Sequence, residues 1–239
     1  MRVSERIRPI ARTVDPTSIE LPDGYTILPV LTDLNYPTSV SWDVDGTMLV
    51  AEGGFPGHGI VADTERRILR VENDGTLTAI ASGFAQLIND ITVYRGLLYV
   101  SHRGRISVLQ DGCIRDLIVG LPSYGMYQNT SIVFDTGGRM YFGQGTVSNA
   151  GVVGPLALQD MEDLTGTHDA HDVPGATVVL TGQNFDVEHP VTGETRLTGA
   201  FSRWGTATPS GHRIASPPPG QAASGASMRA NWDGSELRV

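Results

Sequence analysis

One pattern of paired β-hairpins recurs along the chain. Its first hairpin has four alternating apolar positions, a tight turn that contains glycine, and a second apolar run. The three copies are SVSWDVDGTMLVAEGG (39–54), DITVYRGLLYVSHRG (90–104) and SIVFDTGGRMYFGQG (131–145). Alternation at period two predicts strands, and a turn glycine supplies the positive φ that tight hairpins require.

A second hairpin follows the first in each unit, with an Asp-Gly turn every time. Its copies are RILRVENDGTLTAIASG (67–83), GRISVLQDGCIRDLIVG (104–120) and SMRANWDGSELRV (227–239). The turn glycines of the first hairpins, Gly46, Gly96 and Gly138, lie 50 and 42 residues apart. Four antiparallel strands in about 40 to 50 residues are typical of a β-propeller blade. The sequence therefore predicts an all-β fold with about three four-stranded blades.

The third unit is interrupted by a long insertion over about 147–226. Its residues show no clear period, but the blade pattern resumes in phase afterwards, so we interpret it as an elaborated loop on one face. Within it, GATVVLTGQNF (175–185) predicts a short hairpin, and SPPPGQAASGAS (216–227) has the composition of a linker.

Three blades are fewer than the four to eight that close a ring. We expect an N-terminal extension over 1–23 and an incomplete propeller domain over 24–239, in which GYTILPVLTDL (24–34) forms a further strand. The last apolar strand stops at Val239. Because open blade edges favour association, we expect a truncated or split chain, self-association, or a partner chain that completes the propeller.

Composition and charge exclude several classes of function. The net charge of −9 and pI near 5.0 argue against nucleic-acid binding, which needs a basic surface. No apolar window approaches the roughly 20 residues of a membrane span. The N-terminal MRVSERIRPIAR lacks the apolar run of a signal peptide, and Cys113 is the single cysteine, so the sequence does not encode a compartment.

Several of these stretches resemble the glucose/sorbosone dehydrogenase family, which are soluble six-bladed propellers that use pyrroloquinoline quinone (PQQ) and calcium. The similar segments are PTSVSWDVDGTMLVAEGG, ILRVENDGTLT, LYVSHRGRISVLQDG, FGQGTVSNAGVVG, TGAFSRWGT and RANWDGSELRV. The resemblance covers most of 24–239, roughly the N-terminal half of the family's fold. It implies that a small sugar is oxidised by hydride transfer to PQQ, and the family is typically exported.

The resemblance also implies a catalytic position in the loop before the third blade. There the family has a histidine that takes a proton from the sugar, beside an acidic residue that orients it. This chain has Tyr127 at the histidine position and Met126 at the acid position. A phenol with an ordinary pKa near 10 is about a thousand-fold less available as a base at pH 7. Gln128 keeps the family pattern, and the cofactor site implied for this chain is incomplete.

Residue chemistry adds further candidates near the expected mouth of the propeller. Gln128 and Asn129 are predicted to line a central cleft, or else to form a turn. Arg103, which follows His102 at the end of an inner strand, is predicted to offer its guanidinium to an anion in the channel, with a solvated turn as the alternative.

Two metal hypotheses remain open. Glu52, Asn89 and Asp90 could bind a divalent cation through oxygen ligands, which would support a lactonase-like propeller. The cluster His168, Asp169, His171 and Asp172 is chemically able to hold zinc, although the composition of a polar loop explains it equally well. A third reading is a propeller without catalytic activity that binds a carbohydrate or a protein partner.

Overall fold

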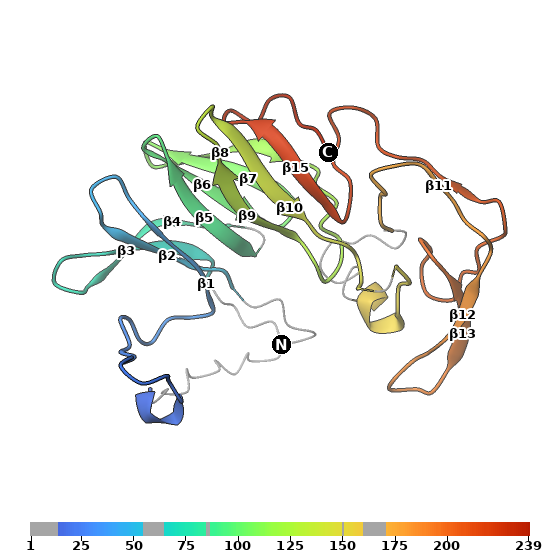
Figure 1. Ribbon diagram of the computed structural model, residues 1–239, viewed down its shortest axis with the longest axis horizontal. Helices are drawn as coiled ribbons and strands as arrows, with labels where there is room; N and C mark the ends of the chain where they lie inside the picture. The colour runs from blue at the N-terminus through green and yellow to red at the C-terminus, as the bar shows by residue number, and fades with distance from the viewer. Residues whose placement is uncertain (1–13, 55–64, 85–86, 150, 160–170) are drawn as a thin grey trace, which may run out of the picture.

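The computed structural model describes residues 14–54, 65–84, 87–149, 151–159 and 171–239. In these ranges the regular structure is almost entirely β, with strands β1 to β15, a 3₁₀ turn at Pro16–Ser18 and a short helical segment over 155–159. No described helix is long and apolar enough to cross a membrane. The described strands form several small antiparallel sheets, none of which closes on itself (Figure 1).

Blades 1 and 2 are four-stranded sheets whose strands follow one another in chain order. Blade 1 consists of β1 (Pro37–Trp42), β2 (Met48–Glu52), β3 (Arg67–Val71) and β4 (Leu77–Ser82). Blade 2 consists of β5 (Ile88–Tyr94), β6 (Leu97–His102), β7 (Arg105–Gln110) and β8 (Cys113–Val119). Every neighbouring pair is antiparallel, so the predicted hairpins of both blades are confirmed.

Blade 3 combines a local hairpin with a strand from the end of the chain. Strands β9 (Asn129–Phe134) and β10 (Arg139–Gln144) form the hairpin, and β15 (Ala226–Asn231) pairs with β10. Beyond β15, Arg238 forms an isolated bridge with Arg229 in the position of a fourth strand. The insertion therefore interrupts the blade between its second and third strands, as the sequence pattern predicts.

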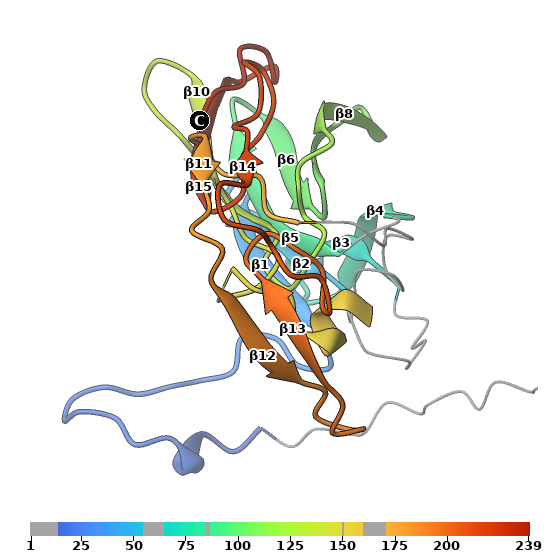
Figure 2. The ribbon, with the colours of Figure 1, turned by 90° about the vertical axis from the view of Figure 1, so that its right-hand side faces the viewer.

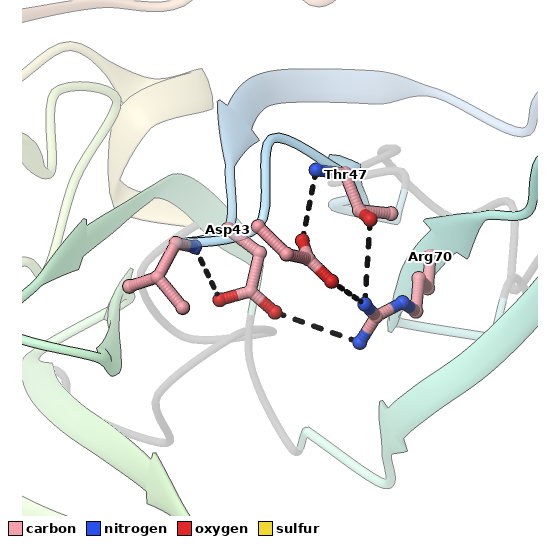
Figure 3. A network of polar contacts seen from close by, with 5 residues as sticks. Asp43, Thr47 and Arg70 are labelled. Carbon is pink, nitrogen blue, oxygen red and sulfur yellow. Dashed lines mark hydrogen bonds and ion pairs between the residues drawn. The ribbon is translucent and has the colours of Figure 1, made fainter.

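The hairpin turns of blades 1 and 2 differ in length and in backbone geometry. In blade 2 the turns Arg95-Gly96 and Asp111-Gly112 have positive φ at both residues, which is the geometry of a two-residue primed turn. In blade 1 the turns are longer, and only their glycines have positive φ. There the Asp45 carboxylate accepts from the Thr47 amide at 2.9 Å, and Arg70 of β3 contacts both Asp45 and Asp43 (Figure 3).

Apolar side chains fill the spaces between successive blades. Between blades 1 and 2 the buried cluster contains Leu49, Ala51, Ile68, Ile91, Leu98 and Val100. Between blades 2 and 3 it contains Tyr99, Ile106, Val108, Ile132, Met140, Phe142 and Met228. The sheets thus pack face to face in an arc, which is the arrangement of blades in a propeller (Figure 1).

Asp90 joins the innermost strands of all three blades. Strand β5 lies between β1 and β9. One carboxylate oxygen of Asp90 accepts from Ser39 Oγ of β1 at 2.7 Å, and the other accepts from the Ile132 amide of β9 at 2.8 Å. Ser39 Oγ also accepts from the Ile91 amide at 3.2 Å. One side chain therefore fixes the relative position of three sheets.

We predict that Asp90→Ala lowers the free energy of unfolding by about 2 kcal/mol, because the Ser39 hydroxyl and the Ile132 amide lose an ionised acceptor. Urea unfolding measures this loss. Asp43→Ala is the matched control, since its carboxylate serves a turn within blade 1 and should cost less than about 1 kcal/mol. Equal losses in the two variants would contradict a role for Asp90 between blades.

The insertion contains strands in a different arrangement from the one predicted. Strand β11 (Val178–Val179) pairs with the distant β14 (Arg213–Ile214), and β12 (Asn184–Glu188) forms a hairpin with β13 (Thr195–Gly199). The prediction of a hairpin within 175–185 is therefore wrong. The β12–β13 hairpin extends away from the blades (Figure 2) and packs on Trp204, whose indole N–H donates to the Val187 carbonyl.

The strand predicted over 24–34 is also wrong. These residues are described, and they form no strand. Three of their apolar side chains are largely exposed, with Tyr25 at 71%, Leu28 at 77% and Val30 at 75%. A strand exists only where a neighbour satisfies its backbone groups, and this segment belongs to none of the sheets that the structure describes. The alternating apolar pattern alone was insufficient evidence for a strand.

Candidate functional site

The loop over 121–128 leads from blade 2 into β9 and is held from behind by Arg103. The Arg103 guanidinium donates to the carbonyls of Ser123 at 2.8 Å, Tyr124 at 2.8 Å and Gly125 at 3.2 Å. Arg103 is only 5% exposed. Its side chain supports the loop from inside the protein, and a role in binding an anion or cofactor stays a prediction that these contacts do not support.

Asn129 fixes the other end of the loop. Its side-chain N–H groups donate to Ser101 Oγ at 2.7 Å and to the carbonyls of His102 and Arg105, both at 3.0 Å. Its Oδ1 accepts from the Gly104 amide at 2.9 Å and from Ser123 Oγ at 2.8 Å. The amide is fully buried. Asn129 thus joins blade 2 to the start of blade 3, and its hydrogen-bonding groups are already engaged.

The middle of the loop runs antiparallel to the chain that leaves β10. The Met126 amide donates to the Val147 carbonyl at 3.0 Å, and the Tyr127 amide donates to the Thr146 carbonyl at 3.2 Å. This approach requires glycine on the facing segment, because a Cβ at Gly145 would lie 2.6 Å from the Cβ of Tyr127. Residue 127 is therefore placed by backbone contacts, independently of its side chain.

An open groove of about 570 Å³ lies where these two segments meet. The lining residues that the structure describes are uncharged: Met126, Tyr127, Gln128, Thr130, Gly143, Gln144, Gly145, Thr146, Asn149 and Gly225. Tyr127 is 44% exposed and Met126 is 61% exposed. Tyr127 and Gln128 thus both reach the groove. Sequence reasoning missed three further lining residues, Thr130, Thr146 and Asn149. Thr130 lies in β9, and the other two follow β10, where the chain runs back beside the loop.

Gln128 is shared between the groove and the blade junction. Its side-chain oxygen accepts from the Asn89 amide N–H at 3.2 Å, and Asn89 also donates to the Asn129 carbonyl at 2.9 Å. Asn89 therefore orients Gln128 from the inner strand of blade 2. This pairing leaves the side-chain N–H groups of Gln128 as the donors it can offer to a molecule in the groove.

The described residues do not fit PQQ with calcium. PQQ carries three carboxylates, and the groove offers no cationic side chain to receive them. Among the residues that the structure describes, no three His, Cys, Asp or Glu side chains gather as metal ligands. The groove by itself is suited to an uncharged ligand.

The residues proposed for a divalent cation have partners of their own. Glu52 is buried and ion-paired with Arg67 at 2.6 Å, and its other oxygen accepts from the Asn35 amide at 2.7 Å. Asp90 is engaged between the inner strands, as described above. Asn89 donates to groups of blade 3. A lactonase-like cation site at these positions stays a hypothesis without support from their contacts.

The second metal candidate lies partly outside the described residues, which omit His168 and Asp169. The ring of His171 contacts the Asp172 carbonyl at 2.8 Å. Asp172 is buried and accepts from the Val147 amide at 2.8 Å. Burial raises the pKa of the Asp172 carboxyl, and hydrogen bonds from Val147 and Ser224 oppose this rise. In the described structure Asp172 anchors the returning insertion to the segment beside the groove.

A buried histidine lies on blade 2 outside the groove. The Ser107 hydroxyl donates its hydrogen bond to Asp116 at 2.6 Å. His102 Nε2 lies 2.6 Å from the same hydroxyl oxygen, so Nε2 must be the protonated nitrogen that donates to Ser107. His102 Nδ1 is then an unprotonated acceptor, and it is buried without a partner among the described residues. Burial lowers the pKa of His102 to about 4. The ring is a neutral structural group at pH 7.

No family model and no curated protein matches the chain. Among solved structures it is similar to a putative oxidoreductase (glucose dehydrogenase) from Thermus thermophilus, with 19% identity and a TM-score of 0.37 over 83% of this chain and 76% of that one. It is also similar to the PQQ-bound aldose sugar dehydrogenase from Streptomyces coelicolor, with 16% identity and a TM-score of 0.41 over 87% and 78% of the two chains.

Proposed function

We propose that the groove beside Tyr127 binds a small neutral sugar, in a propeller of the sugar dehydrogenase type whose catalytic base is replaced. The observation that carries this proposal is the uncharged lining around a half-exposed aromatic ring. A sugar presents hydroxyl groups to amide and hydroxyl side chains, and C–H faces to an aromatic ring. The motifs that resemble the glucose/sorbosone dehydrogenase family support the same class of ligand.

The residues at 126 and 127 define what the groove can do with that sugar. Oxidation by hydride transfer requires a base within hydrogen-bond reach of the reacting hydroxyl. The Tyr127 phenol can donate to or accept from a sugar hydroxyl, but it replaces the histidine that serves as the base in the family. Met126 has no group that could orient or charge it. We therefore expect the groove to bind sugar without efficient oxidation.

Calorimetric titration with a panel of aldoses tests the proposal. We expect saturable binding that Tyr127→Ala weakens about tenfold, which corresponds to about 1.4 kcal/mol. Tyr25→Ala is the matched control, because this tyrosine is 71% exposed and does not line the groove. Absence of binding to every aldose, or equal weakening by the two variants, would refute a sugar site at this groove.

Dye reduction with added PQQ and calcium separates binding from oxidation. The chain should give no reduction above the protein-free rate with any aldose that binds. The variant Met126→Asp with Tyr127→His restores the residue types that the family carries, and it is assayed beside the unaltered chain. Turnover by the unaltered chain would contradict the replaced base while leaving the binding site intact.

A further inference from the structure

The innermost strands of the three blades carry equivalent residues. Val40 of β1, Ile91 of β5 and Ile132 of β9 pair with corresponding residues of the next strand in their own blades, Val50, Val100 and Phe142. The residues directly before them, Ser39, Asp90 and Ser131, are therefore equivalent. In the first two blades this side chain accepts an amide N–H from the next blade, since Ser39 Oγ accepts from Ile91 at 3.2 Å and Asp90 accepts from Ile132 at 2.8 Å. The same junction is thus made twice. Ser131, the third equivalent, is exposed on the outer side of blade 3.

The residue after each of these positions packs against the preceding blade. Ile91 of β5 is 2% exposed and packs on blade 1, and Ile132 of β9 is 3% exposed and packs on blade 2. Their equivalent on β1 is Val40, which is 45% exposed. Strand β1 therefore presents the apolar residue with which the other inner strands contact a preceding blade.

A second position on each strand repeats this relation. Val93 of β5 packs into the cluster with blade 1, and Phe134 of β9 packs into the cluster with blade 2. The equivalent residue of β1 is Trp42, which is 56% exposed. Farther out on the same face of blade 1, Val50 and Leu69 are already buried. The surface that stays open for a preceding blade is therefore the inner strand itself.

We propose that two copies of this chain associate head to tail, with β9 of one copy beside β1 of the other. Ser131 Oγ would then accept the Val40 amide of the second copy, as Ser39 accepts Ile91 within one chain. Val133, which is 60% exposed on the outer side of β9, would meet Val40 and Trp42. The proposal is independent of sugar binding.

Head-to-tail contacts give a closed ring only when the rotation between copies returns to the start. Two copies contribute six blades, which lies within the four to eight of closed propellers. In such a dimer, β9 of each copy lies beside β1 of the other copy. The same junction therefore covers both open inner strands of each copy. The second copy is favoured as the occupant because it carries the complementary half of that junction.

Cross-linking of cysteine variants tests this pairing directly. In a Cys113→Ser background, Val40→Cys is mixed with Ser131→Cys and treated with a short bifunctional maleimide. We expect covalent dimers in the mixture and few in either variant alone, because the proposed pairing places residue 40 of one copy beside residue 131 of the other and brings neither residue close to its own counterpart. Dimers that form as readily with Val40→Cys alone would indicate a face-to-face contact and overturn the proposal.

Sedimentation measures the association without chemical modification. We expect a concentration-dependent dimer whose dissociation constant rises at least tenfold in Trp42→Asp. Val191→Asp is the matched control, since Val191 is 81% exposed in the turn of the β12–β13 hairpin. Unchanged thermal unfolding of the Trp42→Asp monomer would show that the fold survives. A wild-type chain that is monomeric at every concentration would overturn the proposal.

Discussion

Asn129→Ala should lower the free energy of unfolding by about 3 to 4 kcal/mol. The substitution removes five side-chain hydrogen bonds, and it leaves the buried Ser101 hydroxyl, the part-buried Gly104 amide and the carbonyls of His102 and Arg105 without this partner. A buried group that loses its partner costs about 1 to 3 kcal/mol, and such losses within one network are not additive. Urea unfolding followed by circular dichroism measures the change.

The structure supplies a matched control for this variant. Asn149 has the same side chain but lies exposed on the groove, so Asn149→Ala should change stability by less than about 0.5 kcal/mol. Asn129→Asp keeps the acceptor oxygen and loses the donors, so it should also be strongly destabilising. If Asn129→Ala cost less than about 1 kcal/mol, the buried network would not be what joins the loop to blade 2.

Acid should destabilise the protein through His102. Its pKa is about 4 in the folded chain and 6.5 in the unfolded chain. As the pH falls below about 6.5, His102 becomes protonated in the unfolded state but stays neutral in the folded state. The free energy of unfolding therefore falls until about pH 4. The difference of about 2.5 pKa units corresponds to about 3 kcal/mol. The physical cause is the buried Nδ1, which would become a charged donor without an acceptor.

A difference measurement isolates this effect from the carboxylates that titrate in the same range. We expect the stability of wild type minus that of His102→Gln to fall by about 3 kcal/mol between pH 7 and pH 4. Glutamine does not titrate and can still donate to Ser107. His212→Gln is the control, because it makes the same replacement at an exposed histidine. A pH-independent difference for His102→Gln would refute the neutral buried ring.

Local sequence patterns predicted the blades because each hairpin is encoded within about 15 residues. Alternating apolar residues around Gly46, Gly96 and Gly138 specify both strands and the turn, and these glycines all have positive φ. The strand expected over 24–34 failed because a strand also needs a neighbour. In the insertion, β11 pairs with β14 more than 30 residues away, and no local pattern reports such a partner.

The sequence indicated which loop carries the candidate site residues. The role of each residue stays a prediction. Tyr127 and Gln128 lie on the groove as the loop position suggested. Arg103 and Asn129 were predicted to face a ligand, and that role stays a prediction; in the structure both side chains are buried and hydrogen-bond to the loop and to blade 2. The same hydrogen-bonding groups of Arg103 and Asn129 could serve a ligand or the protein itself. Only the three-dimensional packing reveals that carbonyls and hydroxyls of their own chain are the partners.

The interruption of blade 3 has a consequence for the order of folding. Blades 1 and 2 are built from consecutive hairpins, so their strands can pair as soon as they leave the ribosome. Strand β15 must instead find β10 across 81 intervening residues, from the end of β10 at Gln144 to Ala226. Closing that loop costs about 2 to 3 kcal/mol more entropy than closing a five-residue turn. Blade 3 should therefore be the last to form, and its open sheet the species most exposed to aggregation.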